Sequence, residues 1–132
     1  MNAILLDTGI LLDALFHYET LSDKAKDFLE NERFKCYVSA ASILEVAIKH
    51  SAHPDLMPIS GSDLTRVLKE INIDVMPVSI ASLEYIDYVL GQKKHKDPFD
   101  HIILATTLSR GCILLTKDKI IESYCVGNVL LV

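Results

Sequence analysis

The chain has 132 residues, of which 50% are apolar and 23% are charged, with only 5 Gly and 4 Pro. This length is typical of one domain, and we expect residues 1–132 to form it around a single packed core. The composition excludes a disordered or fibrous protein. A net charge of −5 argues against a broad basic surface that binds nucleic acid, although a divalent cation can reverse the field of an acidic cleft.

The apolar runs and the cysteines point to an intracellular environment. Each apolar run is far shorter than the roughly 20 residues of a membrane-spanning helix. The amino-terminal run has no basic residue before it and is interrupted by Asp7, unlike a secretory signal. Cys36, Cys112 and Cys125 form no CxxC pair and have apolar or aromatic neighbours, which predicts buried, reduced thiols. We therefore expect a cytoplasmic protein without membrane association.

The first part of the chain alternates short apolar runs with amphipathic stretches. Residues 3–6 are continuously apolar, which is typical of a strand buried on both faces of a parallel sheet, and an Asp-Thr-Gly turn ends the run. A short helix is expected at 10–16, and Ser22 can cap the next helix. A strand is expected at 36–38, followed by a helix at 42–50.

The remaining chain continues this alternation. In chain order, the sequence predicts a loop at 53–60, a helix at 63–71, a brief apolar run at 75–76, one helix at 79–90, a basic loop at 91–96, a helix at 98–109, a strand at 113–115, a short helix at 119–124 and a strand at 129–132. Pro98 suits a first helical position and Gly111 a C-cap. The whole pattern predicts an α/β fold, a three-layer α/β/α domain around a mostly parallel central sheet.

Acidic residues fall where such a sheet places its functional sites, outside the carboxyl ends of the strands. Asp7 directly follows the first strand, and Asp118 follows the strand at 113–115. Asp100 begins the helix before that strand, and Glu45 is expected in the first turn of the helix after the strand at 36–38. The four carboxylates can therefore converge at one end of the sheet.

Each acid also has a purely structural interpretation. Asp7 can turn the chain, and Asp118 can cap the helix that it precedes. Glu45 completes a Ser-x-x-Glu capping box, while Asp97 and Asp100 suit the N-cap and third position of one helix. Both interpretations stay open for each residue taken singly. The joint placement of the acids at one end of the sheet favours a functional site.

Clustered carboxylates need a cation, because like charges at close range raise one another's pKa. Ligands that offer oxygen atoms alone suit Mg²⁺ or Mn²⁺. Such an ion favours phosphodiester hydrolysis, since it can activate water and stabilise charge on the leaving oxygen. Thr8 and Thr116 place hydroxyls beside the proposed ligands, where they can orient a carboxylate or a metal-bound water, or make local turn hydrogen bonds.

Four segments, LLDTGILLDAL, SAASILEV, HKDPFDHIILATTL and LLTKD, together resemble a PIN domain, in particular that of VapC-like toxins. The family pattern has an Asp after the first strand, a Glu in an early helix, an Asp opening a late helix and an Asp after the next strand. The matching positions, implied to be catalytic and metal-binding, are Asp7, Glu45, Asp100 and Asp118. Related sequences often carry Arg directly after DPFD, where this chain has His101.

The resemblance implies a Mg²⁺- or Mn²⁺-dependent endoribonuclease, the toxin of a toxin–antitoxin pair. It also implies a homodimer and a VapB-like antitoxin partner. Lys93, Lys94 and Lys96 can then hold the RNA backbone near the metal, or form a solvated loop, and Asp97 is assigned a capping or supporting role. The alternative is a non-catalytic PIN-like module that binds RNA or a protein. That alternative needs a missing or displaced acid, and all four matching positions are acidic.

Overall fold

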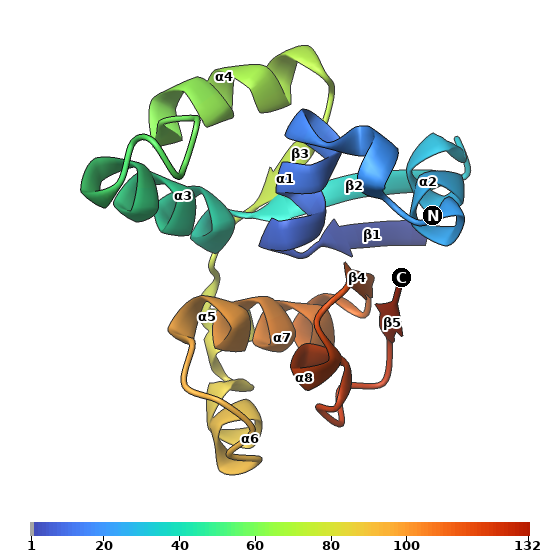
Figure 1. Ribbon diagram of the computed structural model, residues 1–132. Coiled ribbons are helices and arrows are strands. Elements are labelled where there is room, and N and C mark those ends of the chain that lie inside the picture. The colour runs from blue at the N-terminus through green and yellow to red at the C-terminus, as the bar shows by residue number, and fades with distance from the viewer. Residues whose placement is uncertain (1) are drawn as a thin grey trace.

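A five-stranded sheet forms the centre of the computed structural model, which describes residues 2–132, and every strand pairing in it is parallel (Figure 1). The strands are β1 (Asn2–Leu6), β2 (Phe34–Ser39), β3 (Asp74–Met76), β4 (Ile113–Thr116) and β5 (Val129–Leu131). The α-helices are α1 (Thr8–Phe16), α2 (Asp23–Glu30), α3 (Ala40–Ala52), α4 (Gly61–Glu70), α5 (Ile80–Leu83), α6 (Ile86–Gly91), α7 (Pro98–Arg110) and α8 (Lys119–Glu122), and a 3₁₀ turn, η1, spans Tyr18–Thr20.

The strand order is β3-β2-β1-β4-β5, so the chain builds outward from β1 to β3 and then returns to the other side of β1. The strand order therefore reverses between β1 and β4, where a crevice opens at the carboxyl ends of an open α/β sheet. In the register, Leu6 pairs with Leu115, so the residues that follow the two strands emerge side by side. The predicted α/β architecture is confirmed, with a sheet that is entirely parallel.

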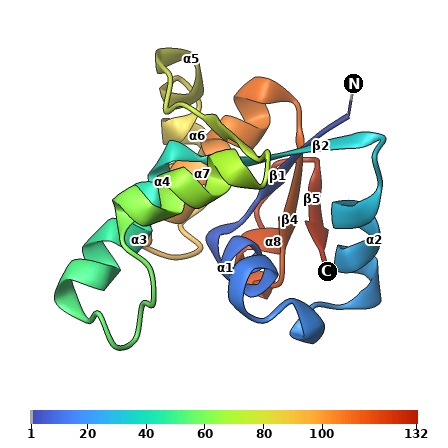
Figure 2. The ribbon, with the colours of Figure 1, turned by 90° about the horizontal axis from the view of Figure 1, so that it is seen from above.

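Helices cover both faces of the sheet, because alternate residues of each buried strand point to opposite sides. Ile4, Leu6 and Leu115 face a core made with α1, α2, α3 and α4, whereas Leu5 and Leu114 face a second core made with α6, α7 and α8. Figure 1 shows these two groups of helices on opposite sides of the strands, and in Figure 2 α4 lies alongside α3, against which it packs. None of the helices within residues 2–132 combines the length and apolar character needed to cross a bilayer.

Three predicted helix starts were wrong by two residues, in each case because a side chain caps the helix earlier; α4, for example, begins at Gly61 after its cap Ser60, instead of at residue 63. Asp7 caps α1, which begins at Thr8 instead of residue 10. Ser39 accepts a hydrogen bond from the Ala41 N–H and caps α3, which begins at Ala40. The predicted capping box ending at Glu45 is therefore wrong, and Glu45 lies in the second turn of α3.

The predicted helix at 79–90 is also wrong, because it is divided into α5 and α6. The Tyr85 N–H bonds to the Ser82 carbonyl three residues back, which interrupts the regular helical ladder at that point. The boundaries of α7 are close to the prediction. Pro98 lies in its first turn, and Gly111 ends it with a φ of 64°, the left-handed conformation that glycine adopts most easily.

The cysteines are free thiols, as expected, but they differ in burial. Cys112 is buried and Cys36 is half-buried, whereas Cys125 is exposed. The apolar neighbours that suggested burial of Cys125 are Tyr124 and Val126, and these turn inward instead. The prediction was wrong there because adjacent residues of the bend after α8 face opposite ways.

Candidate metal centre

Two of the predicted acids, Asp7 and Asp118, lie at the ends of neighbouring strands and are tied to the backbone. Asp7 is 6% exposed, and its carboxylate accepts hydrogen bonds from the Thr8 N–H (2.8 Å) and the Thr116 hydroxyl (2.8 Å). Asp118 accepts from the Ile120 N–H (2.8 Å) and so caps α8. The Asp118 N–H in turn donates to the Thr116 oxygen (3.0 Å). Thr116 therefore links Asp7 and Asp118, which we call the strand-end pair.

The other two acids, Glu45 and Asp100, project from helices, and we call them the helix pair. Asp100 is the third residue of α7, and its Oδ2 lies 3.4 Å from Nε2 of His95. Glu45 is 5% exposed, and its Oε2 accepts a hydrogen bond from Lys49, one turn later on α3, at 2.7 Å. Oε1 of Glu45 is buried without a hydrogen-bond partner in residues 2–132. Each helix acid thus faces one cationic or donor side chain.

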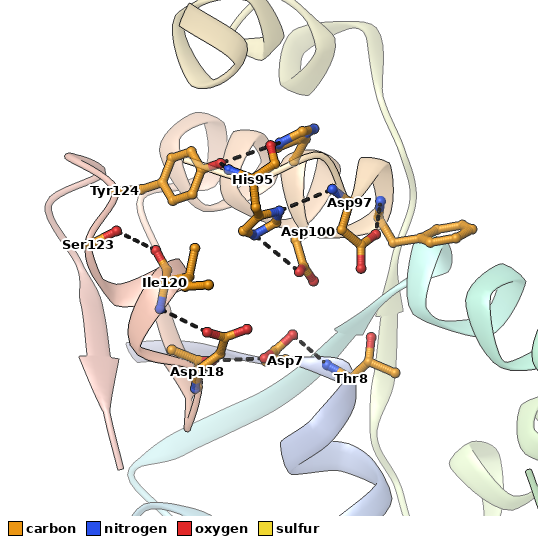
Figure 3. A network of polar contacts seen from close by, with 12 residues as sticks. Asp7, Thr8, His95, Asp97, Asp100, Asp118, Ile120, Ser123 and Tyr124 are labelled. Atoms are coloured by element: carbon orange, nitrogen blue, oxygen red, sulfur yellow. Dashed lines mark hydrogen bonds and ion pairs between the residues drawn. The ribbon is translucent and has the colours of Figure 1, made fainter. Parts of the chain in front are cut away.

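Burial and the neighbouring negative charges raise the pKa of two of the acids, Asp100 and Asp7. Burial raises the pKa of Asp100 to about 8, with further contributions from the negative charges of Asp7, Asp97, Glu45 and Asp118. Burial also raises the pKa of Asp7, against the lowering effect of its hydrogen bonds from Thr116 and Thr8. Figure 3 shows the carboxylates of Asp7, Asp100 and Asp118 turned toward a common space. A bound cation would lower the pKa of Asp7 and of Asp100.

The donor set fits a hard divalent cation. The ligands on offer are carboxylate oxygens, and the unpartnered Oε1 of Glu45 is a buried acceptor that a cation would satisfy. Within the described residues 2–132, no group of three or more His, Cys, Asp or Glu side chains is already arranged to hold a metal ion. Mg²⁺ usually keeps several waters and binds through one or two carboxylates, so an open cluster of this kind suits it.

Comparison with known proteins identifies the family. The PIN domain pattern matches residues 4–126, which is nearly the whole chain. The chain belongs to the PIN domain family. No curated protein matches its sequence closely enough to count as a relative.

Solved structures similar to this PIN domain come from toxin–antitoxin complexes. VapBC2 from Rickettsia felis, bound to a promoter DNA fragment, has a chain with a TM-score of 0.76 and 17% identity, covering 98% of both chains. A toxin–antitoxin complex from Klebsiella pneumoniae gives a TM-score of 0.66 and 21% identity, over 96% of this chain and 95% of that one. DNA-bound VapBC from Salmonella typhimurium gives a TM-score of 0.66 and 18% identity, over 100% of this chain and 98% of that one. At these identities the likeness establishes the fold.

The remaining predicted residues of this PIN domain take different positions. Thr116 contacts Asp7 as described, whereas the Thr8 hydroxyl donates to Ser42 (2.8 Å) and reaches no carboxylate. Asp97 caps α7 by accepting from the Phe99 N–H (3.0 Å). The basic loop presents three exposed lysines, which are Lys93, Lys94 and Lys96.

His101 lies inside this PIN domain and cannot act as an exposed cation. It is 6% exposed, and its Nε2 donates to the His95 carbonyl at 2.9 Å. His101 therefore supports the loop before α7.

The sequence analysis did not predict that two side chains, Lys49 and His95, contact acids of the site. The spacing of Glu45 and Lys49 by four residues is a recognisable helical ion pair and could have revealed the first. His95 carries no local signal for its contact with Asp100, because the loop conformation that brings the two together depends on Tyr124 and His101.

Proposed function

We propose that this PIN domain is a Mg²⁺- or Mn²⁺-dependent endoribonuclease that hydrolyses RNA phosphodiester bonds. The observation that carries the proposal is the gathering of carboxylates beside the point where the strand order reverses, where burial and the neighbouring negative charges raise the pKa of Asp100 to about 8. A divalent cation would relieve this repulsion and attract phosphate.

In this proposal Asp7, Glu45, Asp100 and Asp118 are the catalytic residues that hold the cation. When bound, the cation would activate water and stabilise negative charge on the leaving oxygen. Thr116 holds the Asp7 carboxylate in place, as its 2.8 Å hydrogen bond indicates. Thr8 and Asp97 act indirectly, Thr8 through its N–H to Asp7 and Asp97 by capping α7.

The basic loop is our candidate contact for the RNA backbone. A groove of about 630 Å³ is lined by Lys93, Lys94 and Lys96 together with His95, His101, Pro98 and Leu90. Lys side chains attract phosphate through their charge, and this groove adjoins His95, which contacts Asp100. Replacing the three lysines with Gln should therefore weaken RNA binding and flatten its salt dependence, with little change in Mn²⁺ affinity.

We further propose that the chain is the toxin of a toxin–antitoxin pair and that it acts in the cytoplasm with a VapB-like antitoxin. The solved relatives support this, since they are toxin–antitoxin complexes. A homodimer is supported by large apolar side chains exposed on α3 and α5, with Leu44 at 54%, Ile48 at 51% and Ile80 at 80%. Light scattering at micromolar concentration should give twice the mass of the chain, and a monomeric mass would contradict the dimer.

Asp100→Asn tests the ribonuclease proposal, because it keeps the size of the side chain and removes its charge. The matched control is Asp63→Asn, which removes a charge from the same third position of another helix, α4, where the side chain is exposed. We expect wild type and Asp63→Asn to cleave RNA with Mg²⁺ or Mn²⁺ and to inhibit growth. Asp100→Asn should do neither.

The opposite results separate this proposal from its alternative. Full metal-dependent cleavage by Asp100→Asn would overturn the assignment of the site. Absence of cleavage by the wild type, with RNA binding retained, would favour a non-catalytic PIN-like module.

A further inference from the structure

His95 lies between the basic loop and the carboxylates, in a cluster of aromatic rings. Its ring stacks on that of His101, with centroids 5.4 Å apart and planes inclined by 15°, and meets the edge of Tyr124 at 5.7 Å. Its side chain is only 17% exposed. Figure 3 shows the ring of His95 above Asp100, on the same side of the carboxylates as Tyr124. The imidazole is therefore held in one orientation by its neighbours.

The backbone of His95 is also fixed, by groups from two other parts of the chain. The His95 N–H donates to the Tyr124 hydroxyl oxygen at 3.2 Å, and the His95 carbonyl accepts from Nε2 of His101 at 2.9 Å. Tyr124 follows α8, whereas His101 lies in α7. The loop before α7 is thereby fastened on both sides of His95.

Hydrogen bonding decides which ring nitrogen carries the proton. The Asp97 N–H lies 3.1 Å from Nδ1 of His95, and a backbone N–H can only donate. Nδ1 is therefore an acceptor, so the proton of the neutral imidazole must be on Nε2. Nε2 has no hydrogen-bond partner in the described part of the chain, and it lies 3.4 Å from Oδ2 of Asp100. Nε2 of His95 is thus a buried donor that lies close to one oxygen of the acid without forming a hydrogen bond to it.

We propose that His95 is a positioning residue that orients the Asp100 carboxylate for a divalent cation. Its Nε2–H attracts Oδ2 and leaves Oδ1 turned toward the other carboxylates. The inference rests on the proposed function, because it takes Asp100 to be a metal ligand. Donors behind a ligating group commonly change metal affinity or activity by about 10–100-fold when they are removed.

The two amide variants of His95 separate this role from a purely structural one. In His95→Gln the amide nitrogen can occupy the place of Nε2 and donate to Asp100. In His95→Asn the amide oxygen can occupy the place of Nδ1 and keep the bond from the Asp97 N–H, but the side chain is too short to reach Asp100. Both variants lose the ring stacking with His101 equally, so each is the control for the other.

Mn²⁺ titration by calorimetry, without RNA, measures the effect directly. We expect His95→Asn to bind Mn²⁺ about 10–100-fold more weakly than wild type and His95→Gln to remain close to wild type. RNA cleavage should fall in the same order, through kcat. A structural role through Nδ1 alone predicts the reverse order. The reverse order, or equal losses in the two variants, would overturn the proposal.

A measurement on the unmodified protein covers the case in which the variants fold poorly. Long-range ¹H–¹⁵N spectra of the imidazole should show the proton of His95 on Nε2, and a proton on Nδ1 alone would overturn the proposal.

Wild type that binds Mn²⁺ without cutting RNA would contradict only the ribonuclease proposal, since the comparison of Mn²⁺ affinities still decides the role of His95. Equal Mn²⁺ affinity of wild type and Asp100→Asn would overturn the role of His95.

Discussion

The strand-end pair and the helix pair are held in place by different means. Asp7 and Asp118 each accept a backbone N–H of the helix that they precede, and Thr116 joins them through its hydroxyl. Asp100 and Glu45 are held through side chains, by His95 at 3.4 Å and Lys49 at 2.7 Å. Thr116 belongs to β4 and Thr8 lies two residues after the end of β1, so these partners are fixed by the sheet, whereas the side chain of Lys49 is 56% exposed and can move.

This difference indicates that the acids of the cluster are held with different rigidity. The strand-end pair forms the rigid part, because its partners cannot move without disturbing the sheet. Within the helix pair, Glu45 has the more mobile partner, because Lys49 is exposed, whereas the ring of His95 beside Asp100 is held by its neighbours. Three substitutions probe this contrast, beginning with the largest expected effect.

Thr116→Val should damage the strand-end pair most. The substitution removes the donor to Asp7 and the acceptor for the Asp118 N–H, at a position that is fully buried. We expect a loss of about 1–3 kcal/mol in the free energy of unfolding, because buried polar groups lose their partners. Metal-dependent cleavage should fall by about 10–100-fold.

Thr106→Val is the matched control for Thr116→Val. Thr106 is equally buried, but its hydroxyl donates only to the Ile102 carbonyl of its own helix, at 2.8 Å. Urea unfolding and cleavage assays on both variants measure the difference. Wild-type cleavage by Thr116→Val would show that Asp7 does not depend on this hydroxyl.

The pH dependence of stability tests the helix pair through Asp100. The pKa of this acid is about 8 in the folded protein, whereas an unfolded Asp has a pKa of about 3.9. Without metal, the folded state retains a proton that the unfolded state releases between these values. The free energy of unfolding should therefore fall as the pH rises from about 4 to 8 and level off above 8.

Asp100→Asn removes this titration and should flatten the profile. At pH 8 we expect the variant to exceed wild type by at least about 1 kcal/mol, since each unit of pKa difference corresponds to about 1.4 kcal/mol. Near pH 4 the two proteins should be similar. Thermal unfolding in the presence of a chelator measures both profiles, and parallel profiles would contradict the raised pKa of Asp100.

Lys49→Met should have the smallest effect on stability. The ion pair with Glu45 is a partly exposed pair one helical turn apart, which is typically worth about 0.3–0.5 kcal/mol. Its hydrogen bond to Glu45 raises the pKa of Lys49, so the ammonium stays charged beside the site. Removing that charge should strengthen Mn²⁺ binding by a few-fold, because the ammonium and the cation compete for Glu45. Weaker Mn²⁺ binding would mean that Lys49 positions Glu45 instead.

The sequence predicted those features whose cause lies within a few residues. Continuous apolar runs marked β1 and β4, and acids one or two residues after them marked the candidate site. Caps were predicted correctly at Ser22, Asp97 and Asp118, each of which accepts a backbone N–H close to it in sequence. The predictions failed at the starts of α1, α3 and α4, which are capped earlier than expected, and within 79–90, where the chain forms two helices.

Only the tertiary structure decided how these local pieces meet. Thr116 and Asp7 are 109 residues apart, and no local pattern announces their hydrogen bond. The same holds for the loop that directs His95 at Asp100, since its shape depends on Tyr124, 29 residues away. The order of the strands determines which chain segments become neighbours, and that order depends on the packing of the whole core. The sequence by itself therefore determined the types of element and the candidate acids, and the fold decided which side chains orient them.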